Sequence, residues 1–282
     1  MKKIKLKAPA KINLALKIKN KRPDGYHNLI SILQTISLFD KIKLKKSKKL
    51  KCCCNNKIIP TNNQNLAVKA AIAFFEHCKI KQNVKIKIFK KIPIQAGLGG
   101  GSSNAATVLI GLNKMFETKL SKQELCKIAA KIGADVPFFI FGKTALVSGV
   151  GEIVEQLQPI NLKNILIIKP KKLNIETKLA FLKYDLSKTQ QNNDINSLIE
   201  KFKKQEPFSS YCNSLFNSFE STAANNQIDE IKTKLKSAGA ICALMTGSGS
   251  SVFAVFKTLK LAKKACKLFS KTDFFKFICK TI

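Results

Sequence analysis

The stretch Pro93-Ile94-Gln95-Ala96-Gly97-Leu98-Gly99-Gly100-Gly101-Ser102-Ser103-Asn104 decides how the chain is organised. Its glycines allow tight turns and expose consecutive N–H groups with no Cβ in the way. The preceding segment 84–89 alternates apolar residues and lysines, which predicts a strand, and the apolar segment 105–110 predicts a helix. A glycine loop between a strand and a helix N-terminus favours phosphate, because unpaired N–H groups and the helix dipole attract anions.

Two well-known phosphate motifs do not fit this stretch. The P-loop requires a lysine immediately before the Ser/Thr, and no lysine precedes Ser102. The Rossmann fingerprint requires a glycine where Ser102 stands and a βαβ unit around it. A flexible loop without a ligand is the remaining alternative, and the serines at the helix start argue against it. We therefore expect residues 93–103 to bind the phosphates of a nucleotide.

Length and composition favour a two-domain globular protein. The chain has 282 residues, of which 45% are hydrophobic, and no apolar run is long enough to span a bilayer. Residues 1–7 alternate lysine with apolar residues and lack the apolar core of a signal peptide. We predict an N-terminal domain over 1–157, a C-terminal domain over 158–282, no membrane partner and a cytoplasmic location.

The net charge of +34 raises the possibility of a nucleic-acid partner. Of the 51 basic residues, however, only Arg22 is an arginine, whereas nucleic-acid sites rely heavily on arginine. The lysines are spread over every segment and form no clustered stripe along the sequence. This pattern is typical of an AT-rich genome, so we expect no nucleic-acid partner.

The nine cysteines do not suggest a disulfide framework or a metal site. Their number is odd, Cys52, Cys53 and Cys54 are adjacent, and no Cys-x-x-Cys pair occurs. Only His27 and His77 are available as imidazole ligands. Buried thiols in a reducing compartment are the better interpretation.

Three further segments carry polar residues in unusual settings. Residues 4–18 predict two strands with a break at Ala8–Asn13, where Lys11 and Asn13 point to one face. The turn Arg22–His27 exposes an aromatic ring and an imidazole together, although His27 alone could be an ordinary turn residue. Asp135 lies at a helix end beside a proline and two phenylalanines, where it could be either a helix cap or a reactive carboxylate.

The remaining pattern predicts an α+β fold. We expect two strands within 30–44, a polar irregular segment over 45–65 and helices over 66–78, 103–116 and from Ser121, which starts a capping box. In the second half we expect a strand at 165–168, a polar linker at 190–193, and helices at 175–184, 195–202, 211–224 and 228–238. A β-loop-β-α-β ending over 241–281 suggests a small α+β sandwich.

Three motifs together resemble the GHMP kinase family: Ala8–Asn13, Pro93–Asn104 and the second glycine loop, Met245–Val252. The resemblance covers nearly the whole chain. It implies a ribosomal-protein-like N-terminal ATP domain and a ferredoxin-like C-terminal domain. It also implies transfer of a phosphoryl group from ATP, with Mg²⁺, to an alcohol. The resemblance further implies Asp135 as the catalytic base and Lys11 as its charge partner, which suits a loose phosphoryl transfer that needs positioning and cations.

Within that family, Pro9–Leu14, Arg22–His27 and Gly133–Phe138 are most similar to the branch whose small-molecule substrate carries a cytidine diphosphate head. This implies phosphorylation of the 2-hydroxyl of an erythritol unit in isoprenoid biosynthesis. The resemblance also implies the substrate contacts: Tyr26 and Phe181 stack on the cytosine, His27 hydrogen-bonds it, and Asn13, Thr177, Gly247 and Gly249 lie close to the substrate.

The sequence departs from the family pattern at few places. Asn217-Ser218-Phe219-Glu220 has a serine where the family has an aspartate, and the 45–65 segment has no clear counterpart. Only Ser102 or Ser103 suggests itself as a Mg²⁺ ligand. The alternatives are a homoserine or mevalonate kinase, or a basic RNA-binding protein on the same N-terminal fold. Either a monomer or a homodimer is compatible with the sequence.

Overall fold

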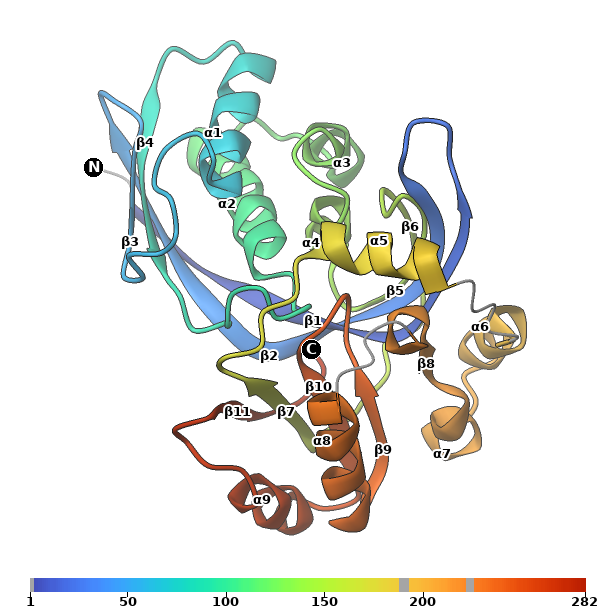
Figure 1. Cartoon of the computed structure of the whole chain (residues 1–282). Coiled ribbons are helices and arrows are strands. Elements are labelled where there is room, and N and C mark those ends of the chain that lie inside the picture. Colours follow the sequence, from blue (N-terminus) through green and yellow to red (C-terminus); the bar gives the residue numbers. More distant parts are fainter. Residues whose placement is uncertain (1–2, 188–192, 222–225) are drawn as a thin grey trace.

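The computed structural model describes residues 3–187, 193–221 and 226–282, which form two β-sheets flanked by helices (Figure 1). The larger sheet has seven strands in the order β3-β4-β2-β1-β8, with β5 on β2 and β6 on β5. Its strands are β1 (Lys3–Lys21), β2 (His27–Ser47), β3 (Lys51–Cys54), β4 (Asn83–Phe89), β5 (Thr144–Gly149), β6 (Ile153–Gln156) and β8 (Phe216–Asn217).

The long antiparallel pair β1 and β2 crosses the middle of the molecule. The predicted break at Ala8–Asn13 and the predicted division of 30–44 into two strands are therefore wrong. The irregularity takes the form of register shifts between Pro9 and Ala10 and between Asn13 and Ala15. A bulge bends a strand without ending it, which reconciles the proline with a continuous strand. The segment 45–65, expected to be irregular, contains the short strand β3, parallel to β4.

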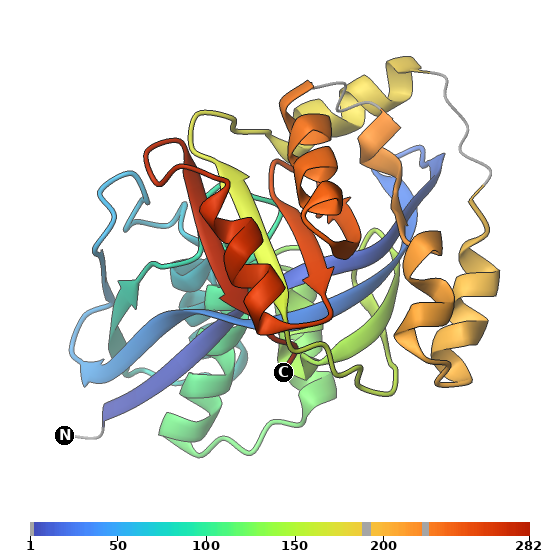
Figure 2. The same ribbon diagram turned by 90° about the horizontal axis from the view of Figure 1, so that it is seen from below.

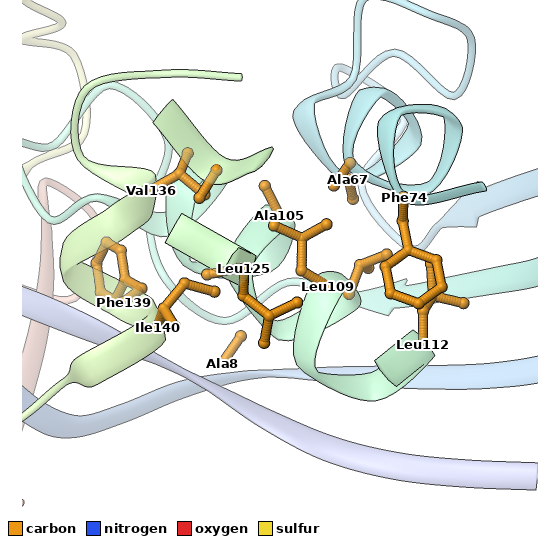
Figure 3. Packing of buried hydrophobic residues seen from close by; sticks show 14 of the residues in the cluster. Ala8, Ala67, Phe74, Ala105, Leu109, Leu112, Leu125, Val136, Phe139 and Ile140 are labelled. Atoms are coloured by element: carbon orange, nitrogen blue, oxygen red, sulfur yellow. The ribbon is translucent and has the colours of Figure 1, made fainter. Parts of the chain in front are cut away.

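Four helices cover one face of this sheet and enclose a hydrophobic core (Figure 3). They are α1 (Leu66–His77), α2 (Gly100–Phe116), α3 (Lys122–Ala130) and α4 (Val136–Phe141). Phe74 of α1 and Leu109 and Leu112 of α2 are fully buried within this core. The capping box of Ser121 and Glu124 is confirmed, with both of its hydrogen bonds present. This core fixes the position of α2 and thereby of the glycine loop that precedes it.

The second sheet has the order β11-β7-β10-β9 with every neighbouring pair antiparallel. Together with α8 and α9 it follows the chain order β7-α8-β9-β10-α9-β11, which is the ferredoxin-like arrangement expected from the resemblance. Figure 2 shows α8 and α9 on the outer side of this sheet. Its elements are β7 (Ile165–Pro170), α8 (Asn226–Ser237), β9 (Ala240–Met245), β10 (Val252–Phe256), α9 (Leu259–Lys267) and β11 (Phe274–Cys279).

Between β7 and α8 the chain forms α5 (Thr177–Ser187), α6 (Ile195–Lys203) and α7 (Phe208–Tyr211). The predicted helix at 211–224 is wrong, because this segment holds two 3₁₀ turns and β8, and residues 222–225 lie outside the described part. The predicted linker at 190–193 also lies outside it, apart from Asn193.

The two halves share contacts, and the boundary at residue 157 stays a prediction. Strand β8 pairs in parallel with β1, and Thr281 forms a bridge with Ile36 of β2. A second core cluster joins Ile12 and Ile36 of the large sheet with Ile167 and Phe253 of the small one. None of the helices in the described residues is both long and apolar enough to cross a membrane.

One sheet face carries a grid of lysines, so the expectation of no clustered basic surface is wrong. The register aligns Lys3-Lys45-Lys85-Lys51 in one row across four strands and Lys5-Lys43-Lys87 in the next. Lys7 and Lys41 begin a third row that ends at Phe89. These side chains point away from the helices, because their apolar neighbours along each strand pack into the helical core.

Candidate active site

A cavity of about 710 Å³ lies between the two halves of the chain. Every residue from Pro93 to Ser102 contributes to its wall. Of the other predicted site residues, the wall includes Lys11, Asn13, Asp135, Thr177, Phe181 and Gly247. Tyr26, His27, Ser103 and Gly249 are described residues that do not line it. Most of the predicted site thus meets in one place, although the segments are far apart in sequence.

The glycine loop continues directly into α2, which begins at Gly100 rather than at the predicted Ser103. Gly99 is the N-cap with φ of +66° and no side-chain cap, so the first N–H groups of α2 have no intrahelical partner. A Cβ on Gly99 would stand 2.8 Å from the Phe139 ring, whereas one on Gly101 would make an ordinary contact of 3.5 Å with Leu66. The loop can therefore present bare backbone donors to an anion in the cavity.

The second glycine loop packs against the first, backbone to backbone. A Cβ on Gly97 would lie 2.0 Å from the carbonyl oxygen of Thr246, and a Cβ on Gly247 would lie 2.8 Å from that of Gly97. The Asn217 Nδ2 donates to the carbonyl oxygens of Met245 and Gly247, at 2.9 and 2.8 Å. Glycine is thus required at these positions by close approach. A Cβ on Gly249, in the same loop, would lie 2.8 Å from Met245 Sδ.

Asn13 connects the second glycine loop to Lys11. Its Oδ1 accepts from the Lys11 Nζ at 2.6 Å and from the Gly247 N–H at 2.9 Å, and its Nδ2 donates to Ser31 Oγ at 2.8 Å. Its own N–H donates to Thr246 Oγ1 at 2.9 Å. Although Asn13 lines the cavity, its side chain is engaged within the protein, so it holds the site together.

Lys11 and Asp135 form an ion pair at the cavity wall. The Lys11 Nζ lies 3.9 Å from Asp135 Oδ2, and the two side chains are 5% and 40% exposed. Burial lowers the pKa of Lys11 below its usual value, and the neighbouring Asp135 carboxylate opposes that shift. The ammonium is thus held in a poorly solvated place beside a half-exposed carboxylate. This is an arrangement in which a further anion would be stabilised.

Asp135 is not a helix cap. It occupies the N-cap position of α4, but its side chain makes no capping hydrogen bond. The sequence left open a helix cap or a reactive carboxylate, and the helix-cap interpretation therefore lacks the hydrogen bond that defines it. The carboxylate faces the cavity instead.

The residues expected to bind a base gather at the start of α5. The rings of His27 and Phe181 stack with centroids 4.8 Å apart and planes at 13°, and Phe219 meets Phe181 edge-on at 4.9 Å. Thr177 Oγ1 lies 3.1 Å from Ser248 Oγ of the second glycine loop. Tyr26, on the adjoining turn, is 64% exposed.

Sequence reasoning missed a buried ion pair beneath the glycine loop. The Asp40 carboxylate accepts from the Lys90 ammonium and from the N–H groups of Lys91 and Ile92 at 2.7 and 2.9 Å. Lys90 lines the cavity, and its Nζ stands 2.9 Å from the Cβ position of Gly100. No spacing singles out one lysine among so many, so only the fold reveals this cation.

The residues around the cavity fit a nucleotide with Mg²⁺ better than a metal held by protein alone. Among the described residues there is no cluster of three or more His, Cys, Asp or Glu side chains. Mg²⁺ in kinases uses one or two side chains together with phosphate oxygens and water. Ser102 lines the cavity and suits this role, whereas Ser103 does not line it and its Oγ is buried without a hydrogen-bond partner.

Comparisons with known proteins agree with this geometry. Residues 65–143 match the model of the GHMP kinases N terminal domain, and residues 198–271 match that of the GHMP kinases C terminal domain. A curated relative from Clostridium beijerinckii, named 4-diphosphocytidyl-2-C-methyl-D-erythritol kinase, is 42% identical and covers 99% of this chain and 100% of its own.

Two further relatives carry the same activity in their names. The relative from Caldicellulosiruptor bescii, also named 4-diphosphocytidyl-2-C-methyl-D-erythritol kinase, is 41% identical over 94% of this chain and 93% of its own. A crystal structure of 4-(cytidine 5'-diphospho)-2C-methyl-D-erythritol kinase superposes with a TM-score of 0.79 at 28% identity, covering 99% of both chains.

Proposed function

This chain belongs to the GHMP kinase family, and within it to the 4-diphosphocytidyl-2-C-methyl-D-erythritol kinases; we propose that its cavity performs the reaction as follows. The enzyme transfers the γ-phosphoryl group of ATP to the 2-hydroxyl of 4-diphosphocytidyl-2-C-methyl-D-erythritol in the non-mevalonate isoprenoid pathway. The observation that carries the residue assignment is the Lys11–Asp135 pair beside the open N-terminus of α2, all within one cavity.

Asp135 acts as the base that accepts the proton of the substrate hydroxyl. Its carboxylate reaches the cavity and is free of helix capping. The Lys11 ammonium stabilises the transferring phosphoryl group, whose charge is spread over its equatorial oxygens. Burial disfavours the charged form of Lys11, so this ammonium stabilises an incoming anion more strongly than a solvated lysine would.

The backbone N–H groups at the start of α2 bind the ATP phosphates, with the Lys90 ammonium beside them. Bound Mg²⁺, held by Ser102 together with phosphate oxygens, would neutralise charge on the phosphate oxygens. Phe181 and Tyr26 stack on the cytosine, and His27 hydrogen-bonds it. Thr177 and the second glycine loop line the path between the two ends of the substrate.

These assignments need only one chain, so a monomer suffices. The nine cysteines are all free thiols, but only Cys212, Cys242 and Cys279 are buried, so the expectation of buried thiols is wrong for the other six. Free thiols support a reducing compartment and hence our placement of the reaction in the cytoplasm. We expect no nucleic-acid partner to be needed for activity.

The test is phosphoryl transfer from γ-labelled ATP to three acceptors in parallel: the cytidyl substrate, homoserine and mevalonate. We expect label only in the cytidyl product. Equal or better labelling of homoserine or mevalonate would overturn the proposal. Salt-dependent RNA binding without any turnover would instead support the RNA-binding alternative.

A further inference from the structure

No motif of the sequence singles out Asp185 on α5, yet it contacts the base-binding corner formed by His27 and Phe181. Its Oδ1 lies 2.6 Å from the Nε2 of His27, although 158 positions separate them in the sequence. Its Oδ2 accepts from the Lys21 Nζ at 2.7 Å. Lys21 and His27 are the pair of residues next to the turn of the β1–β2 hairpin, so the Asp185 carboxylate connects α5 to this hairpin.

The carboxylate determines which nitrogen of His27 carries a proton. The hydrogen bond from Lys21 lowers the pKa of Asp185, burial opposes the shift, and the hydrogen bond from His27 lowers the pKa further. An ionised carboxylate can only accept, so the proton of the 2.6 Å bond belongs to Nε2. In the neutral imidazole the other nitrogen, Nδ1, is then an acceptor.

The same contact fixes the plane of the imidazole. The ring lies within 13° of parallel to Phe181 with centroids 4.8 Å apart. At a stacking separation of about 3.5 Å this corresponds to a lateral offset of roughly 3 Å, so His27 covers only part of the Phe181 face. A base stacked on the rest of that face would be coplanar with the imidazole and would meet its edge.

We propose that Asp185 is a positioning residue for base recognition: it holds His27 in the Nε2–H tautomer and in the plane of a base stacked on Phe181. Nδ1 then accepts a hydrogen bond from an exocyclic amine such as that of cytosine, and it repels the carbonyl oxygen that uracil has at the same place. The specificity for a cytidine head group therefore depends on Asp185. This inference rests on the proposed function, because it takes the cytidyl substrate as the ligand of this corner.

The tautomer can be measured without any substrate. The chain has only two histidines, and His77 is exposed at the end of α1, so a His77→Gln variant leaves His27 as the single imidazole signal. Long-range ¹⁵N–¹H spectra should show a protonated Nε2 and an unprotonated Nδ1 for His27 near neutral pH. A neutral ring protonated at Nδ1, or a ring protonated at both nitrogens, would overturn the inference.

Kinetics tests the consequence for specificity. We expect Asp185→Leu, which is similar in size but cannot accept the Nε2 proton, to raise the KM for the cytidyl substrate roughly 10-fold or more. In this variant the preference for the cytidyl substrate over its uridine counterpart should fall towards equality. The KM for ATP and the kcat should stay within about twofold of the wild-type values. Asp185→Asn keeps an oxygen that can accept the proton, so it should retain more of the preference. Glu155→Gln is the control, because it removes a carboxylate paired with Lys203 far from these rings.

A failure of the proposed function and a failure of the positioning role of Asp185 would give different results. If the wild-type protein does not turn over the cytidyl substrate, the proposed function fails, and the tautomer measurement still stands by itself. If the wild type is active but Asp185→Leu and Asp185→Asn both keep the full preference for cytidine, the positioning role is wrong. Should Asp185→Leu fail to fold, Asp185→Asn and the wild-type spectrum decide the question.

Discussion

Lys11 differs from most lysines of the chain in being buried. Its side chain is 5% exposed, and the one carboxylate that pairs with it among the described residues lies 3.9 Å away, so burial lowers its pKa. A group whose pKa is lower in the folded than in the unfolded chain weakens the fold below the folded-state pKa, because the unfolded chain binds the proton more readily. That penalty is relieved as pH rises through the folded-state pKa towards 10.5.

We therefore expect Lys11→Met to fold well and to lose activity. Methionine fills similar space without a buried charge, so the free energy of unfolding should be equal to or above that of the wild type at pH 7. The difference in free energy of unfolding between Lys11→Met and the wild type should shrink as pH rises towards 10.5. Denaturant melts at several pH values measure this, with Lys17→Met as a control on the same strand. A variant that is destabilised equally at all pH values would contradict the account.

The sequence predicted Lys11 and Asp135 because each lies in a recognisable local motif. It did not predict how Asn13 is used, since the partners of its side chain include Ser31 and Gly247. Asp185 was missed for the same reason, because its contacts come from the distant hairpin at Lys21 and His27. Local pattern identifies a reactive residue, whereas its orienting contacts depend on the tertiary fold.

At the scale of elements, the start of α2 gives a cleaner test of phosphate binding than the loop before it. Gly99 has a positive φ and would clash with Phe139, so any side chain there disturbs the fold as well as the ligand. Gly101 is exposed towards the cavity and has room for a Cβ. We expect Gly101→Val to raise the KM for ATP at least 10-fold with an unchanged or higher Tm, because glycine is a poor helix former.

The control for Gly101→Val is Gly133→Val, which adds the same side chain outside the cavity, where a Cβ would meet only Val136 at 3.6 Å. That variant should leave the KM for ATP unchanged. Normal ATP binding by a folded Gly101→Val protein would show that the phosphates do not lie against the first turn of α2.

The loop between β7 and α5 depends on a second buried lysine. The Lys169 Nζ donates to the carbonyl oxygens of Pro170 and Leu173 and to Asn174 Oδ1, at 2.8–3.0 Å, and Ser250 also donates to the Leu173 oxygen. This loop leads into Ile175 and Thr177 of the cavity wall. It therefore transmits the position of the second sheet to the substrate end of the site.

Lys169→Met should leave those oxygens unsatisfied. We expect it to lower the free energy of unfolding by about 1–3 kcal/mol and to raise the KM for the cytidyl substrate more than that for ATP. Lys172→Met, at an exposed position of the same loop, is the matched control. A Lys169→Met variant with an unchanged free energy of unfolding and unchanged KM values would refute this role of Lys169 in holding the loop.

Periodicity predicted most elements but not their continuity. Alternating residues identified the strands around Pro9, yet the strand passes this proline by shifting register. The segment 211–224 was expected to be helical, whereas Asn217 pairs with Leu16 of β1 in the large sheet. Its side chain also donates hydrogen bonds to the carbonyl oxygens of Met245 and Gly247. Tertiary contacts outweighed local propensity at both places.

At the scale of the whole molecule, the lysine grid is the feature that no linear pattern could show. Its rows arise only from the pairing of four strands. Like charges directly opposite one another destabilise a sheet, and ions in solution screen them. We expect the Tm to rise with added NaCl.

Lys43 lies at the centre of the grid, opposite Lys5 and Lys87. Lys43→Glu would replace two repulsions with two attractions and should stabilise the fold by about 0.2–1 kcal/mol. Lys57→Glu, an exposed turn position outside the grid, controls for the change in net charge. The gain at Lys43 should exceed that at Lys57 at low salt and should diminish in 1 M NaCl; equal gains at both positions would contradict a special role for the grid.

The central claim, that Asp135 is the base of a kinase reaction, is tested most directly by the kcat of Asp135→Asn with ATP and the cytidyl substrate. Asparagine keeps the shape but cannot accept the proton, so kcat should fall about 10²–10⁴-fold with little change in either KM. Glu176→Gln, which alters another carboxylate of the cavity wall, should change kcat only a few-fold. A near-normal kcat in folded Asp135→Asn would contradict the account and move the base elsewhere.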